Sequence, residues 1–260
     1  MNKMKLGIAL LLCIIVYGLV FFPFSGEMDV SRRLSSPSIV APFGFDALGR
    51  NLFFEVAKGA LVSISISLAT VAISMVLGLF IAYMMSREGF LSNVFSVVCD
   101  TFKVIPPAIL ALFLASISGS GVVKLVIALS MAASSNIART MYMRIAVMNK
   151  EEYVCIASSY GKSNISIFIE HQVIQLVPYI REQGMSLMLS TILTESALSY
   201  LGCGVGVSTV SLGSILSNAR GVVFSYPHAT IFPSIVLIVL ASSLVLISKG
   251  MEDCRRTRFY

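Results

Sequence analysis

The sequence predicts an all-α, polytopic membrane protein. Of its 260 residues 57% are hydrophobic and 12% are charged, and the mean hydropathy is +0.89. Soluble domains carry about 25% charged residues. Several apolar runs approach or exceed the roughly 20 residues that a helix needs to cross a bilayer. Since lipid offers no hydrogen bonds to the backbone, and the short alternation of a barrel strand is absent, these runs are expected to be helices.

Six transmembrane helices are predicted, in one domain that covers residues 1–260. The first span, 6–24, follows Lys3 and Lys5 and lacks a convincing small-residue cleavage site, so we expect a retained helix. The second span, 60–85, is the clearest. The remaining spans are expected at 94–118 (kinked by Pro106 and Pro107), 122–138, 183–201 and 231–247.

The basic residues orient the predicted helices. Lys and Arg lie mostly at the ends of apolar runs, and more of them fall beside the two termini and the segment 140–181 than in the opposite loops. Because Lys and Arg accumulate in cytoplasmic loops, both termini and 140–181 are expected inside. The net charge is +6, but its basic residues do not form a patch interleaved with aromatics, which argues against a nucleic-acid partner.

No enzymatic site is predicted. The sequence lacks a phosphate-binding P-loop, an HExxH motif and a GxSxG motif, and it has only two histidines. The five cysteines are scattered without a CxxC pair, so neither a metal centre nor a disulfide framework is expected. The chain should therefore bind no cofactor and hydrolyse no ATP, and active transport would take its energy from another subunit.

The longest polar interruption of the second half, 151–178, predicts two helices joined by a turn. Gly161 fits the left-handed position after a first helix. Ser163 or Asn164 can cap the second helix, which is amphipathic. From its residues alone, this segment fits either an interfacial anchor or a docking element for a soluble partner.

Glu195 lies inside a predicted span, where a carboxyl group is costly and usually faces a bundle interior or a cavity. One interpretation is a residue that lines or gates a translocation pathway. The other is a packing carboxyl group bonded to Thr191, Thr194 or a partner subunit. The sequence leaves both open.

Four blocks, in order over about residues 40–258, resemble the second permease subunit of ABC importers for dipeptides, oligopeptides and nickel. The stretch 44–51 (GFDALGRN) is similar to that family's GTDxxGRD block, and 195–202 (ESALSYLG) is similar to its EASLSFLG block. The cytoplasmic EAA loop is matched by Glu152, Tyr153, Ala157, Gly161, Ser163 and His171. The last block comprises Ser211, Leu212, Gly213, Arg220, Phe232 and Pro233.

The resemblance implies the type I ABC-importer permease fold in a bacterial inner membrane. The expected cargo is di- or oligopeptides, or nickel or metal chelates, delivered by an extracellular binding protein. The expected partners are a second permease subunit, as a heterodimer, and two ATPase subunits that use ATP. The loop around Gly161 would then be the coupling helix. Cys155 and Ile156 replace the Glu-Ala of the EAA loop, and Ile174 replaces a proline, so a divergent member is expected.

Asp46, Gly49, Arg50 and Arg220 are expected on the outer face, where they could dock the binding protein or occlude the cavity. Two other functions stay open. One is a permease of another ABC-importer branch, for amino acids or methionine, although the block 44–51 argues against it. The other is an ATPase-independent secondary transporter, which should show inverted repeats or several intramembrane ionisable residues.

Overall fold

The computed structural model describes residues 2–24, 28–87, 89–118, 121–206 and 209–256. These parts of the chain are helical and contain no strand beyond two isolated bridges, Met28 with Arg50 and Phe45 with Asn51. The all-α prediction is confirmed. Four of the described helices are long and apolar enough to cross a membrane, namely α1, α2, α5 and α10, whose bounds follow.

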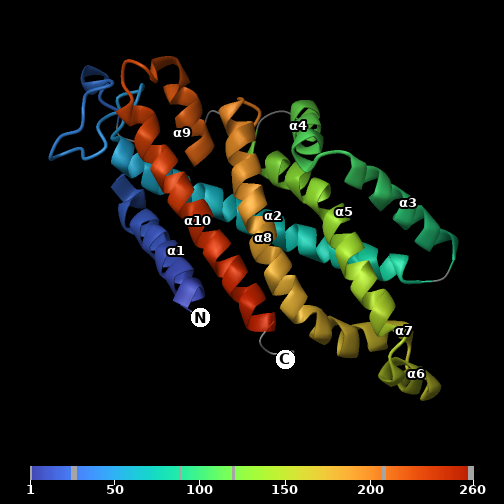
Figure 1. Cartoon of the computed structure of the whole chain (residues 1–260). Coiled ribbons are helices and arrows are strands. Elements are labelled where there is room, and N and C mark those ends of the chain that lie inside the picture. Colours follow the sequence, from blue (N-terminus) through green and yellow to red (C-terminus); the bar gives the residue numbers. More distant parts are fainter. Residues whose placement is uncertain (1, 25–27, 88, 119–120, 207–208, 257–260) are drawn as a thin grey trace.

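Five long helices form the body of the molecule (Figure 1): α1 (Asn2–Phe21), α2 (Leu52–Met85), α5 (Val122–Met148), α8 (Val173–Tyr200) and α10 (His228–Arg256). The shorter helices are α3 (Phe90–Val104), α4 (Pro107–Ser118), α6 (Glu152–Ser159), α7 (Asn164–Ile167) and α9 (Leu212–Ala219). Single turns complete the described structure: η1 (Phe22–Phe24), η2 (Val30–Arg32), the π-helical η3 (Phe168–Gln172) and η4 (Arg220–Val222).

The expected single span 94–118 is two helices, and this corrects the prediction of one kinked helix. α3 ends at Val104, Ile105 is extended, and the Pro106 carbonyl accepts hydrogen bonds from the N–H groups of Ile109 and Leu110 at 2.9 and 3.1 Å. Two successive prolines lack N–H donors, and each also disfavours helical geometry in the residue before it. The helix therefore stops and restarts instead of bending.

Other helices run past the expected spans. α2 begins at Leu52 instead of residue 60, α5 continues to Met148 instead of ending at 138, and α8 begins at Val173 instead of 183. The segment 140–181 is thus helical at both ends. Hydrophobicity locates only the part of a helix that lies in lipid, whereas backbone hydrogen bonding continues until a breaker or a cap.

The buried apolar side chains of the described residues form four clusters between the helices. One cluster joins α1, α2, α8, α9 and α10 around Leu52, Ile192, Leu212 and Leu244. α2 packs along α5, where a second cluster includes Met75, Ile137 and Met141. The start of α1 and the end of α10 lie at the end of the bundle that carries α6 and α7, whereas α9 and the residues before α2 lie at the opposite end (Figure 1).

Candidate functional site

The segment after α5 forms the expected helix–turn–helix. α6 ends at Ser159, and Gly161 takes a φ of +77°. Lys162 N–H donates to the Ala157 carbonyl at 3.3 Å, which completes a left-handed helix ending. The Ser163 hydroxyl caps α7 by accepting from Ser166 N–H at 3.3 Å. We call residues 151–172 the hairpin.

The second arm of the hairpin is anchored on the bundle. Ile167 is 3% exposed, and Phe168 packs on Tyr83 of α2 with ring centroids 4.8 Å apart. The Gln172 amide donates to the side-chain oxygen of Asn149, at the end of α5, at 2.7 Å. From η3 the chain continues directly into α8. This arm therefore contacts α2 and the end of α5, and it is continuous with α8.

The first arm is exposed. α6 contains no buried residue; Glu152 is exposed and Ala157 is partly exposed. Ile156 and Tyr160 on the first arm, and Ile165 and Ile169 on the second, are each more than half exposed. Exposed apolar groups that gather on one element mark an interaction surface. The hairpin thus has a surface that nothing in the described chain covers.

Polar contacts tie the first arm to α8 and the turn to the second arm. Tyr153 donates to the Gln175 side chain of α8 at 3.4 Å, and its ring lies 6.2 Å from that of His171. Partial burial raises the pKa of the Tyr153 phenol. Lys162 pairs with Glu170, and the hydrogen bond from Lys162 is the main cause that lowers the pKa of Glu170.

A cavity of about 520 Å³ lies between α5 and α8. Its α5 wall includes Leu129, Ala132 and Ala133, and Pro106 and Ala108 contribute from the α3–α4 break. The polar groups that face it are Asn136, Thr140, Gln183, Ser186, Ser190, Thr191 and Thr194. None of the described lining residues is charged. We call this space the central cavity.

Glu195 does not line the central cavity. It is 0% exposed and faces α2, where Ser63 donates to its Oε2 at 2.9 Å, while Ser199 of α8 donates to its Oε1 at 2.8 Å. The partners considered from the sequence, Thr191 and Thr194, face the central cavity instead. The hydrogen-bond partners within the described chain are serines, and the one from α2 is 132 residues away along the chain.

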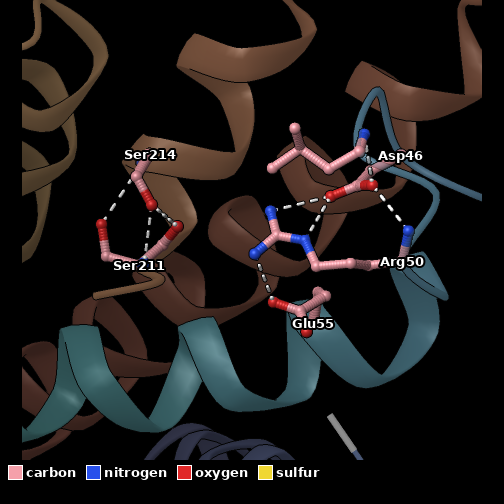
Figure 2. A network of polar contacts seen from close by, with 6 residues as sticks. Asp46, Arg50, Glu55, Ser211 and Ser214 are labelled. Atoms are coloured by element: carbon pink, nitrogen blue, oxygen red, sulfur yellow. Dashed lines mark hydrogen bonds and ion pairs between the residues drawn. The ribbon is translucent and has the colours of Figure 1, made fainter. Parts of the chain in front are cut away.

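Asp46 and Arg50 lie side by side in the turn before α2 (Figure 2), and the N–H of Gly49 donates to the Asp46 carbonyl at 3.1 Å. Asp46 accepts the backbone N–H groups of Leu48 and Arg50, each at 2.8 Å, and pairs with the Arg50 guanidinium at 2.8 Å. Gly49 has a φ of +77°, and a Cβ there would lie 2.2 Å from the Asp29 carbonyl oxygen. All three residues are buried, so they stabilise the turn and contribute little to the outer surface.

Glu55, the second acidic residue beside Arg50, was not predicted as a site residue. Glu55 is 1% exposed, and its Oε2 lies 3.4 Å from Nη1 of Arg50 (Figure 2). A carboxyl group in the first turn of a long apolar helix, five residues after an arginine, was the signal that could have found it. Arg220 does not join this group; it is exposed and lies over the Tyr200 ring at 5.9 Å.

No helix was predicted between the expected spans 183–201 and 231–247, where α9 lies. Ser211 and Ser214 form a reciprocal capping box at its start, a local signal that the sequence carries. Leu212 and Gly213 are buried, and a Cβ on Gly213 would lie 2.4 Å from the Ser196 carbonyl oxygen. α9 therefore packs back onto α8. No group of three potential metal ligands occurs among the described residues.

The chain was compared with known proteins. The family model described as "Binding-protein-dependent transport system inner membrane component" matches residues 74–253. Glutathione transport system permease protein GsiD of Pectobacterium atrosepticum is 27% identical over 256 residues, which covers 95% of this chain and 83% of that protein. The GsiD of Escherichia coli O6:K15:H31 is 26% identical over 251 residues, with the same coverage.

Two solved structures are similar in fold. Both are inward-facing conformations of the MetNI methionine ABC transporter. The native crystal form aligns with a TM-score of 0.63 at 16% identity, over 79% of this chain and 97% of that chain. The selenomethionine-soaked form aligns with a TM-score of 0.61 at 16% identity, over 78% and 96%. At this identity the likeness concerns the fold alone.

Proposed function

Since the chain belongs to the family of binding-protein-dependent transport system inner membrane components, we propose that it is the permease through which a bacterial ATP-driven importer takes up small peptides. It is an inner-membrane component of an ABC importer, a family that works with ATPases and a binding protein. The proposed assembly contains a second, different permease subunit, two ATPase subunits and an extracellular binding protein.

The observation that carries the proposal is the hairpin. An exposed apolar arm stands at one end of the bundle, and its companion arm is fixed to α2, α5 and α8 by Ile167, Phe168 and Gln172. Such an element can take up the movement of a docked ATPase and pass it to the helices that surround the central cavity. Glu152, Tyr153, Ala157, Gly161, Ser163 and His171 are its proposed coupling residues.

The central cavity supports a peptide cargo. Its polar lining consists of hydroxyl and amide groups, which can donate to and accept from peptide bonds. Relatives at 27% and 26% identity are named as permeases for glutathione, itself a tripeptide. The described lining contains no His, Cys or carboxyl group to attract nickel, so a peptide is favoured over a metal chelate.

The outer end supplies the proposed contact with the binding protein. Arg220 is exposed, as is Phe224 a few residues later, whereas Asp46, Gly49 and Arg50 are buried in their turn. Arg220 is therefore the outer-face candidate that a partner can touch, and the other three hold the surrounding loop in shape. In this arrangement both termini are cytoplasmic, on the side of the hairpin.

Substitution of Gly161 tests the coupling role. A Cβ at Gly161 would meet nothing within 4 Å, so the positive φ of +77° is the only constraint on a new side chain. Gly161→Val should strain the turn by about 1–2 kcal/mol or more, whereas Gly161→Asn, which tolerates this conformation, is the matched control. The reconstituted importer should show at least roughly tenfold less ATP-dependent glutathione uptake with Val, and near-normal uptake with Asn.

The same reconstituted importer tests the cargo. Labelled glutathione, a dipeptide, methionine and Ni²⁺ are offered in parallel, each with ATP and with a non-hydrolysable analogue. Uptake of glutathione or the dipeptide, dependent on ATP hydrolysis, supports the proposal. Uptake of methionine or Ni²⁺ alone would assign another importer branch, and uptake unaffected by the analogue would point to an ATPase-independent transporter. Normal coupling in Gly161→Val would remove the hairpin from the mechanism.

A further inference from the structure

We propose that Glu195 keeps the outer end of the central cavity closed by holding both ends of the connection between α8 and α9. Glu195 is a positioning residue in this proposal, because it meets the connection through the hydroxyl groups of Ser63, Ser199 and Ser211 and does not reach the central cavity. The inference rests on the proposed transport function, and it assigns to this carboxyl group a part of the conformational cycle.

Two hydrogen-bond relays converge on the Glu195 carboxyl group. In the first, Leu212 N–H donates to the Ser63 hydroxyl at 3.4 Å, and Ser63 donates to Oε2 at 2.9 Å. In the second, Val205 N–H donates to the Ser199 hydroxyl at 3.4 Å, and Ser199 donates to Oε1 at 2.8 Å. Each hydroxyl accepts from the backbone and donates to the carboxyl group, so both carboxyl oxygens act as acceptors.

The second relay begins at Val205, just after α8 ends, and the first begins at Leu212, where α9 starts. Val205 is 2% exposed and packs in a cluster with Leu125, Leu129 and Leu198. Leu129 also lines the central cavity, whose other α5 residues lie further toward the hairpin. The cluster therefore forms the outer boundary of that cavity, and the second relay fixes one of its members.

The first relay fixes the start of α9. Leu212 is 0% exposed and packs with Leu52 and Ile192, in the cluster that joins α9 to α2 and α8. Ser63 lies on α2, so the relay binds three helices through one hydroxyl. If the cavity opens outward between α5 and α8, Val205 or α9 must move. The hydrogen bonds of the relays must then break, or Ser63, Ser199 and Glu195 must move with them.

The substitution Glu195→Gln would disrupt the two relays with little change in side-chain shape. The glutamine amide has one acceptor oxygen and one donor nitrogen, so only one of the two serines keeps an acceptor, and the hydroxyl proton of the other loses its partner. Loss of one relay should shift the ratio of closed to open outer ends by at least roughly tenfold.

The test measures access to the central cavity from outside. Ser190→Cys, which lines that cavity, is the reporter in a chain whose native cysteines are replaced by alanine. The assembled importer is placed right-side-out in vesicles without ATP, and a membrane-impermeant maleimide is added outside. We expect Glu195→Gln to speed labelling at least roughly tenfold, and Ser63→Ala with Ser199→Ala to do the same.

Ser196→Ala is the matched control. Its hydroxyl also approaches Oε2, at 3.4 Å, but no hydrogen bond from the connection reaches it in the described structure. Slow labelling in Ser196→Ala and fast labelling in both Glu195→Gln and the double serine variant support the proposal. Slow labelling in either of the latter two, or equally fast labelling in Ser196→Ala, overturns it.

The labelling result and the transport result can be told apart. The maleimide reaction needs neither cargo nor ATP, so an importer that fails to take up peptides would refute the proposed function while the labelling rates still decide on Glu195. A variant that merely misfolds is recognised by its loss of the bound ATPase and second permease. Altered outside access with the complex intact is a change that simple destabilisation would not produce.

Discussion

Replacement of Arg50 by methionine is expected to destabilise the protein by about 3–5 kcal/mol, the usual cost of removing one partner from a buried ion pair. The structure indicates where this cost arises. Asp46 would keep its two backbone N–H donors, at 2.8 Å each. Glu55 is 1% exposed, pairs with Arg50 at 3.4 Å, and has no hydrogen-bond partner among the described residues, so it would be left buried without compensation.

Within the described chain, Asp46 keeps hydrogen-bond donors without Arg50 whereas Glu55 does not, so a second substitution is made at Glu55. Adding Glu55→Gln to Arg50→Met removes the uncompensated charge and should recover about 2 kcal/mol. Arg32→Met is the control on the same outer segment. Arg32 pairs with Asp29 at 3.1 Å, but the two side chains are 59% and 49% exposed, so its loss should cost at most about 1 kcal/mol.

The free energy of unfolding is measured by chemical denaturation in detergent micelles for the four proteins side by side. The reasoning is refuted if Arg50→Met lies within about 1 kcal/mol of wild type, the range of an exposed pair. It is also refuted if Glu55→Gln makes the Arg50 variant less stable, since that would show that Glu55 is stabilised by contacts other than Arg50.

Two further predictions concern α9 and the hairpin. Gly213→Ala should cost about 1–3 kcal/mol, because its Cβ would lie 2.4 Å from a backbone carbonyl of α8, while Gly221→Ala, which meets nothing within 4 Å, should be neutral in the same denaturation assay. The lowered pKa of Glu170 means that its pairing with Lys162 stabilises the hairpin fully above the ordinary glutamate pKa of about 4.3 and is lost as the pH falls further, through the lowered value. Tyr160→Trp would be the only tryptophan, and its fluorescence should change below about pH 4. If the pH-dependent change in fluorescence remained the same after Glu170→Gln, Glu170 could not be its cause.

The hairpin shows how far local reasoning reaches. The turn at Gly161 and a cap at Ser163 or Asn164 were predicted, because each depends on residues within one or two helical turns. The sequence left open whether the hairpin is an interfacial anchor on lipid or a docking element for a soluble partner. The anchoring of one arm through Phe168 and Gln172, and the exposure of the other, depend on Tyr83 and Asn149, which are distant in the sequence.

The composition and the apolar runs by themselves determined an all-helical membrane chain, since lipid leaves the backbone few alternatives. The ordered blocks indicated an ABC-importer permease, and the family match confirmed it. Only the tertiary structure decided which polar groups meet: Glu195 with Ser63 across 132 residues, Leu212 with Ser63 across 149, and Glu55 with Arg50. A hydrophobic pattern reports which face of a helix is buried but not which helix covers it, so the partners of a buried polar group follow from packing.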